Sequence, residues 1–381
     1  MSKIKFAVLG SGHIGKRHAE MIKRNNEAEL VALIEIDEAK HIDLKKLFDE
    51  VPIFNSFEEF ISSDIKCDVI NIATPNGIHA SQALKAIESG HHVVIEKPMG
   101  LSKMECENVI YKALHHSKNV FCVMQNRYSP PSEWLKKIVT DGTLGEIYMV
   151  QVNCYWNRDD RYYKKAGLQT FANPTLQQAS LHSTAEPTLR QASLHTSVNP
   201  TIQQGAWHGT KELDGGTLFT QFSHFIDLMY WVFGDIEDIQ AKFSDFNHTD
   251  LTDFEDSGFV NFRFTNGGMG ALNYSTSVWD KNLESSMTII GKNGTIKVGG
   301  QYMDKVEYCH IKDYEMPELK PTNPPNDYGQ YKGSAANHHY IIENVVDVLK
   351  GRSRITTNAL EGLKVVDIIE RIYALKKGIK G

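Results

Sequence analysis

A glycine-rich turn between a short apolar strand and an amphipathic helix restricts the fold of this chain more than any other feature. Residues 3–9 are predicted to form the strand, and Gly-Ser-Gly-His-Ile-Gly follows it at once. Glycines at these spacings permit a tight turn and let a pyrophosphate approach the free N–H groups that open the helix. The context predicts a dinucleotide-binding Rossmann unit. The residues expected at the cofactor are Gly10, Gly12, His13, Ile14 and Gly15.

A second predicted strand, residues 30–34, ends in Glu35, which follows Gly15 by 20 residues. An acid at this spacing accepts hydrogen bonds from the adenosine ribose hydroxyls, and its charge repels the 2′-phosphate of NADP. The sequence therefore predicts NAD as the cofactor. Asp37 is a competing candidate for the ribose, and the alternative without function is a glycine turn followed by a solvated acid.

Two further buried strands end in polar residues. One begins at Asp68 and runs into the turn Thr74-Pro75-Asn76, while the other, within 91–100, ends in Glu-Lys-Pro and delivers Lys97. Ligands of open α/β sheets bind outside the carboxyl ends of the strands, so Lys97 is placed to meet cofactor and substrate together. The alternative is a surface lysine at a strand-to-loop junction, because lysine is seldom fully buried.

The hydrophobic pattern changes near residue 125. Before it, strand–helix alternation continues through a helix at 102–117 and a strand at 120–124, which predicts a doubly wound parallel sheet. After it, strands such as 146–156 and 257–264 alternate apolar and polar residues, as antiparallel strands do. Asn-Gly dipeptides punctuate this half as hairpin turns. Two helices, 337–349 and 359–377, are expected to close the chain.

We therefore predict an α/β protein of two domains. Residues 1–125 form a Rossmann NAD-binding domain, and 126–381 form an α+β substrate and oligomerisation domain with an open, mainly antiparallel sheet. The length of 381 residues suits two cores.

Bulk properties exclude several classes of partner. A net charge of −6 with no basic stripe argues against nucleic acid, and no stretch approaches the ~20 apolar residues of a membrane span. The first residues run straight into a strand without a signal-peptide core, which predicts a cytoplasmic location. The five cysteines form no Cys-x-x-Cys pair, so neither a metal site nor a disulfide framework is expected.

The motifs together resemble those of the Gfo/Idh/MocA oxidoreductases. The resemblance rests on the glycine turn, Ala-Thr-Pro-Asn at 73–76, Glu-Lys-Pro at 96–98 and Asn-Arg-Tyr-Ser-Pro at 126–130. It implies a second domain whose sheet covers the nicotinamide and assembles a homodimer or homotetramer. It also implies further residues at the cofactor, namely His79, Glu96, Lys97, Gln125 and Arg127.

A second stretch, residues 213–228, resembles the catalytic signature of that family. The resemblance implies that a helix brings His224 to the substrate opposite Lys97, and that Gln221 also contacts the substrate. The sequence departs from the signature at Thr220, where many members have an acid or asparagine, so no acid at that position orients the imidazole. The alternative for His224 is a histidine packed on a helix face, and the sequence leaves open which of Lys97 and His224 is the base.

The substrate class follows from a narrower resemblance. Residues 154–163, 207–210 and 337–349 are similar to bacterial enzymes that oxidise the 3″-hydroxyl of UDP-N-acetylglucosaminuronate for surface polysaccharide. The guanidinium groups of Arg158 and Arg161 match a diphosphate or a uronate, although a solvated arginine pair is an equal alternative. The remaining substrate-contact candidates are Tyr128, Trp207 and Thr220.

Two other functions fit the same motifs. An inositol or free-sugar dehydrogenase, or a 3-ketosugar reductase, would use the same scaffold. A non-catalytic regulator that binds NAD and a sugar is the alternative of another class, because a fold does not fix a function.

Three tandem units of 13 residues, each with an x-Pro-Thr core, occupy most of 168–206. Their period matches no known repeat architecture. We expect a loop insertion outside both cores, either without function or acting as a lid or a subunit contact.

Overall fold

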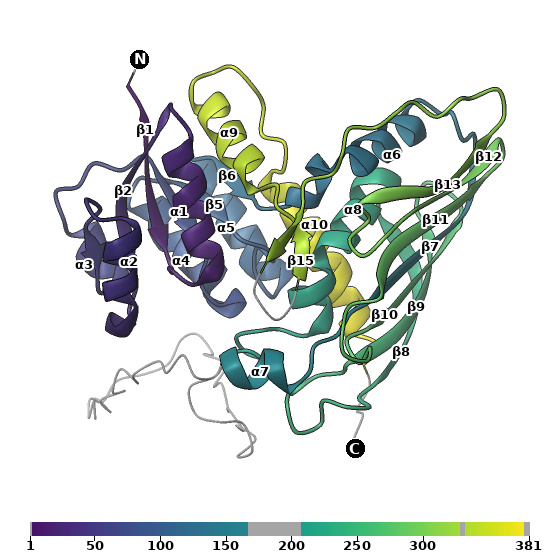
Figure 1. The fold of residues 1–381 in the computed structure, drawn as a ribbon, viewed down its shortest axis with the longest axis horizontal. Helices are drawn as coiled ribbons and strands as arrows, with labels where there is room; N and C mark the ends of the chain where they lie inside the picture. Colours follow the sequence, from purple (N-terminus) through teal and green to yellow (C-terminus); the bar gives the residue numbers. More distant parts are fainter. Residues whose placement is uncertain (1, 167–206, 328–331, 377–381) are drawn as a thin grey trace, which may run out of the picture.

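The structure is a computed structural model that describes residues 2–166, 207–327 and 332–376 (Figure 1). The predicted repeat insertion at 168–206 lies outside the described residues.

The N-terminal part is a six-stranded parallel sheet in the order β3-β2-β1-β4-β5-β6. This order confirms the predicted Rossmann fold. The strands are β1 (Ile4–Leu9), β2 (Ala28–Ile34), β3 (Ile53–Phe54), β4 (Val69–Ile72), β5 (His92–Ile95) and β6 (Val120–Cys122). The helices between them are α1 (His13–Arg24), α2 (His41–Leu47), α3 (Phe57–Ile61), α4 (His79–Glu88) and α5 (Lys103–His115).

The second domain contains a seven-stranded sheet in the order β13-β12-β11-β7-β10-β9-β8. Every neighbouring pair is antiparallel except β7 and β10, which run parallel, so the mainly antiparallel sheet is confirmed. The strands are β7 (Ile147–Tyr155), β8 (Ile236–Ser244), β9 (Ser257–Phe264), β10 (Met269–Ser275), β11 (Glu284–Gly291), β12 (Gly294–Gly299) and β13 (Lys305–Ile311). A small hairpin is formed by β14 (Pro325–Asp327) and β15 (Lys332–Ala335).

Helices α8 (Ser223–Phe233) and α10 (Ala359–Tyr373) lie between the two sheets (Figure 1). Residues such as Phe225 and Val365 share one apolar core with the inner face of the second sheet, where β9 alternates buried and exposed residues as a half-buried strand should. The helices are α6 (Pro130–Thr140), α7 (Asp160–Ala166), α8 (Ser223–Phe233), α9 (His338–Leu349) and α10 (Ala359–Tyr373).

The last two helices pack on the first domain. Helix α9 lies against α1, and its Ile342 and Val345 belong to the same buried cluster as Phe6 and Val8 of β1. Helix α10 packs against both α5 and α8. It begins with a capping box, in which Asn358 and Glu361 exchange side-chain and backbone hydrogen bonds. The core of the Rossmann part therefore includes residues from beyond position 126.

Within the described residues, no helix combines the length and the apolar character needed to span a membrane. The predicted oligomeric state and cytoplasmic location stay predictions.

Candidate active site

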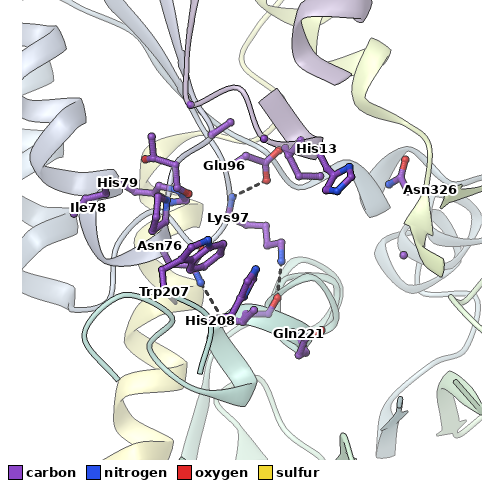
Figure 2. Close-up of a pocket in the computed structure, with 18 of the residues that line it drawn as sticks. His13, Asn76, Ile78, His79, Glu96, Lys97, Trp207, His208, Gln221 and Asn326 are labelled. Carbon is purple, nitrogen blue, oxygen red and sulfur yellow. Dashed lines mark hydrogen bonds between the residues drawn. The ribbon is translucent and has the colours of Figure 1, made fainter. Parts of the chain in front are cut away.

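A cleft of about 570 Å³ lies at the carboxyl ends of the parallel strands and faces the second domain. Figure 2 shows Lys97 extending from the first domain toward the segment that carries Gln221. Most of the residues predicted from sequence line this cleft. They are Gly10, Gly12, His13, Ile14, Glu35, Thr74, Pro75, Asn76, His79, Glu96, Lys97, Gln125, Arg158, Arg161, Trp207, Thr220, Gln221 and His224.

The glycine turn fits a dinucleotide pyrophosphate. A Cβ at Gly10 would lie 2.7 Å from the Ala73 carbonyl oxygen, and one at Gly15 would lie 1.8 Å from that of Gly10, so neither position admits a side chain. A Cβ placed on Gly12 would have no neighbour within 4 Å, so there is space for a ligand beside this glycine. Helix α1 has no side-chain cap and no acid in its first turn, so its N–H groups are available to an anion.

Glu35 is held at the edge of the cleft by the backbone around it. Its carboxylate accepts hydrogen bonds from the N–H of Ser11 at 2.9 Å and that of Asp37 at 3.0 Å. A carboxylate fixed in this way can accept further bonds from ribose hydroxyls. The Asp37 carboxylate instead caps a short 3₁₀ turn by accepting from Ala39 N–H, and it does not line the cleft. The ammonium of Lys40, which sequence reasoning missed, lies 3.5 Å from Glu35.

Lys97 reaches across to the second domain. Its Nζ donates a hydrogen bond of 2.6 Å to the carbonyl oxygen of Thr220. Burial lowers the pKa of Lys97, and the negative charges of Glu96 and Asp214 partly offset this effect. The amine is thus fixed in position at the boundary of the two domains, inside the cleft.

His224 lies in the first turn of α8, directly after a π-helical turn over Leu218–Phe222. The residue is 4% exposed. Burial, and next the charge of Lys97, lower the pKa of His224 well below its ordinary value, so the imidazole is neutral at physiological pH. A neutral imidazole offers a lone pair that can accept a proton.

An acid does stand beside Thr220, although the sequence at that position has none. The Thr220 hydroxyl donates to the carboxylate of Asp214, which is fully buried. The same hydroxyl accepts from the Asn76 amide at 2.9 Å. Asp214 also accepts from Gly209 N–H at 2.8 Å. A residue six positions earlier thus places a carboxylate beside the Thr220 hydroxyl, and the expectation that no acid at position 220 orients the imidazole stays a prediction.

The two predicted arginines differ in their surroundings. Arg158 is buried, its Nε donates to Gln221 at 2.7 Å, and its guanidinium lies over the Trp156 ring with 4.7 Å to the centroid. Arg161 is exposed and forms ion pairs with Asp159 at 2.7 Å and Asp280 at 3.3 Å. Arg161 is thus exposed and paired with two acids, whereas the guanidinium of Arg158 is buried and held in one position at the cleft.

Two of the remaining candidates, His79 and Glu96, line the cleft and also make side-chain contacts within the first domain. The ring nitrogens of His79 lie 2.7 Å from the Pro98 carbonyl oxygen and 2.8 Å from that of Thr74, so His79 ties two strand-end turns together. Glu96 is buried next to Lys97, and its carboxylate contacts His18.

Four predicted site residues do not line the cleft, namely Gly15, Asp37, Arg127 and Tyr128. Arg127 is buried and donates to both carboxylate oxygens of Asp227, at 2.8 and 2.6 Å, and to Glu361 at 2.7 Å. The ring of Tyr128 stacks on Tyr340 with 5.2 Å between centroids. Gln125, at the start of the same turn, does line the cleft, so the roles of Arg127 at the cofactor and of Tyr128 at the substrate stay predictions.

Several cleft residues were missed from sequence. Three of them, Trp156, Tyr162 and His208, lie inside stretches on which the narrower resemblance rests, and His338 opens a helix that was predicted. Asn326 and Ser334 come from the β14–β15 hairpin, which has no local signal. The polar and aromatic residues missed are Lys40, Gln82, Trp156, Tyr162, His208, Asn326, Ser334 and His338.

A Rossmann domain whose glycine turn, fixed acid and strand-end lysine share one cleft defines an NAD-binding oxidoreductase. Two family models match the chain in succession. Residues 4–124 match the oxidoreductase family with an NAD-binding Rossmann fold, and residues 186–297 match the Gfo/Idh/MocA C-terminal domain. The chain belongs to the Gfo/Idh/MocA oxidoreductase family.

Solved structures extend the likeness over nearly the whole chain. The WlbA dehydrogenase of Bordetella pertussis, solved with NADH and UDP-GlcNAcA, is 27% identical, with 99% of this chain and 98% of that chain covered and a TM-score of 0.77. WlbA of Chromobacterium violaceum, solved with the same two molecules, is 26% identical, with 98% and 94% covered and a TM-score of 0.78.

The match to one curated relative covers a smaller part of the chain. The D-glucoside 3-dehydrogenase of Escherichia coli is 27% identical over 149 residues, which span 39% of this chain and 42% of that protein. The comparisons thus agree on an oxidoreductase of the sugar-dehydrogenase type and differ in the sugar.

Proposed function

We propose that the protein is an NAD-dependent dehydrogenase that oxidises the 3-hydroxyl of a UDP-linked N-acetylglucosaminuronate, for surface polysaccharide synthesis. The observation that carries the proposal is the presence of Lys97 and His224 in one cleft, delivered by different domains, beside the buried cation of Arg158. Further support comes from the similarity to WlbA over almost the full chain.

The two residues have complementary roles in alcohol oxidation. NAD, when bound, supplies the hydride acceptor. His224, neutral because it is buried, takes the proton of the substrate hydroxyl. Lys97, held by the Thr220 carbonyl, stabilises the negative charge that develops on that oxygen.

Arg158 suits the carboxylate of a uronate. Its guanidinium is fixed by Gln221 and by the ring of Trp156, so little conformational entropy is lost when an anion binds. We assign this role to Arg158 in preference to Arg161, because Arg158 is buried at the cleft whereas Arg161 is exposed.

The test is an assay of NADH formation with UDP-N-acetylglucosaminuronate, followed by absorbance. Lys97→Met and His224→Ala should each lower kcat by roughly 10²-fold or more, because general acid–base catalysis contributes about that much. The affinity for NAD, measured separately, should change little. Lys103→Met, an exposed lysine at the start of α5, is the matched control and should keep wild-type activity.

Two results would redirect the assignment. Oxidation of UDP-N-acetylglucosamine as fast as its uronate would contradict the role of Arg158 in binding the uronate carboxylate. Oxidation of free glucosides or inositol instead of UDP-sugars would favour a free-sugar or inositol dehydrogenase. If no sugar were turned over and both variants bound ligands like the wild type, a non-catalytic regulator would be the better reading.

A further inference from the structure

Behind Lys97 lies a buried cluster of two histidines and one acid. Its members are Glu96 at the end of β5, His18 on α1 and His338 at the start of α9. The Glu96 carboxylate lies 2.8 Å from His18 Nε2 and 3.5 Å from His338 Nε2. Glu96 is 7% exposed, and both histidines are 1% exposed. Glu96 and His338 also line the cleft, so the cluster is continuous with the cofactor site.

The cluster keeps Glu96 ionised. Burial by itself raises the pKa of Glu96, but hydrogen bonds from His18 and His338 outweigh it and leave the pKa well below its usual value. A third hydrogen bond, of 3.2 Å, comes from the Lys97 backbone N–H. Buried carboxylates without such donors would take up a proton instead.

The histidines stabilise this anion without cancelling its charge. The Asn71 amide donates to Nδ1 of His18 at 3.0 Å, which is the arrangement of the neutral tautomer with its proton on Nε2, facing Glu96. Burial lowers the pKa of His338 despite the charge of Glu96, so this ring is neutral as well. The cluster therefore contributes one negative charge to the wall of the cleft. An arginine or lysine in place of either histidine would have neutralised it.

The spacing of the three ligand atoms, all within 4.8 Å of one another, is also compatible with a metal ion. His18 Nε2 lies 2.8 Å from Glu96 Oε1, which is the length of a hydrogen bond between the two groups. A hydrogen-bonded cluster accounts for each of these contacts.

The nicotinamide ring carries a positive charge in oxidised NAD and none in NADH, so a negative charge in the cleft acts on only one of the two forms. We propose that Glu96, held as an anion by His18 and His338, makes the cleft bind oxidised NAD more tightly than NADH. His18 and His338 are positioning residues that act through Glu96. The inference deepens the proposed function and rests on it, because preference for the oxidised cofactor keeps the cleft loaded with the form that alcohol oxidation consumes.

The test is calorimetric titration of the full chain with NAD⁺ and with NADH, without any sugar. Glu96→Gln should weaken NAD⁺ binding by roughly tenfold relative to NADH, the size expected for one charge several ångströms away in a partly polar medium. Glu96→Asp keeps the charge and should retain most of the preference. Because no sugar is present, the result is independent of the substrate assignment.

Two controls separate charge from structure. Glu35→Gln, at the ribose end of the cleft, should weaken both forms equally. His18→Leu should shift the NAD⁺/NADH ratio in the direction of Glu96→Gln, and His18→Gln, which restores a donor, should reverse the shift. Equal loss of affinity for both forms in Glu96→Gln would overturn the proposal. It would also be overturned if zinc or another divalent ion stabilised the wild type but not that variant.

Discussion

Replacement of Arg127 by methionine should destabilise the protein strongly without weakening NAD binding. Arg127 joins the turn before α6 to α8 and α10 through Asp227 and Glu361. Without the guanidinium, Asp227, whose side chain is 1% exposed, loses both of its charge-assisted hydrogen bonds. Glu361 loses less, because it is 23% exposed and still accepts from Asn358 N–H in the capping box.

The magnitude follows from these losses. Removing one partner of a buried ion pair costs about 3–5 kcal/mol of unfolding free energy, since the remaining charge stays buried. Denaturant unfolding followed by circular dichroism measures this cost. Arg127→Met with Asp227→Leu should recover much of the stability, because the uncompensated charge is then absent. The reasoning is refuted if Arg127→Met unfolds like the wild type but binds NAD much more weakly, which would make Arg127 a cofactor residue.

The other predictions concern the cleft. Glu35→Ala should weaken NAD binding. It should improve NADP binding, because it releases Lys40 from its 3.5 Å contact with Glu35. Equal affinity of the wild type for both cofactors, measured by titration, would contradict the role of Glu35. Asp214→Asn removes a negative charge that raises the pKa of Lys97, so the pKa of Lys97 should fall. The decrease in kcat/KM at high pH, where Lys97 loses its proton, should therefore begin at a lower pH. A pH profile with an unchanged alkaline limb would show that Asp214 has only a structural role.

The fold could be predicted from sequence because its signals are local. The glycine turn opening α1, the alternation in β9 and the Asn-Gly turn between β11 and β12 each lie within a few consecutive residues. The position of Lys97 at the end of a strand could likewise be predicted from the residues next to it.

The parts that could not be predicted depend on distant contacts. Arg127 and its partner Asp227 are 100 residues apart, so no local pattern shows that the guanidinium is already satisfied. The contact of Asp214 with Thr220 is close in sequence, but it depends on the π-helical turn at 218–222, whose register leaves no signature in residue type.

The packing of α9 and α10 on the first domain has a consequence for biosynthesis. The buried faces of Phe6 and Val8 are covered by residues 338–349, which leave the ribosome only after most of the second domain has been made. At about 5–20 residues per second, the first domain remains incomplete for many seconds with apolar surface exposed. Nascent chains of this protein should therefore be bound by chaperones until the final helices emerge and close the nucleotide-binding core.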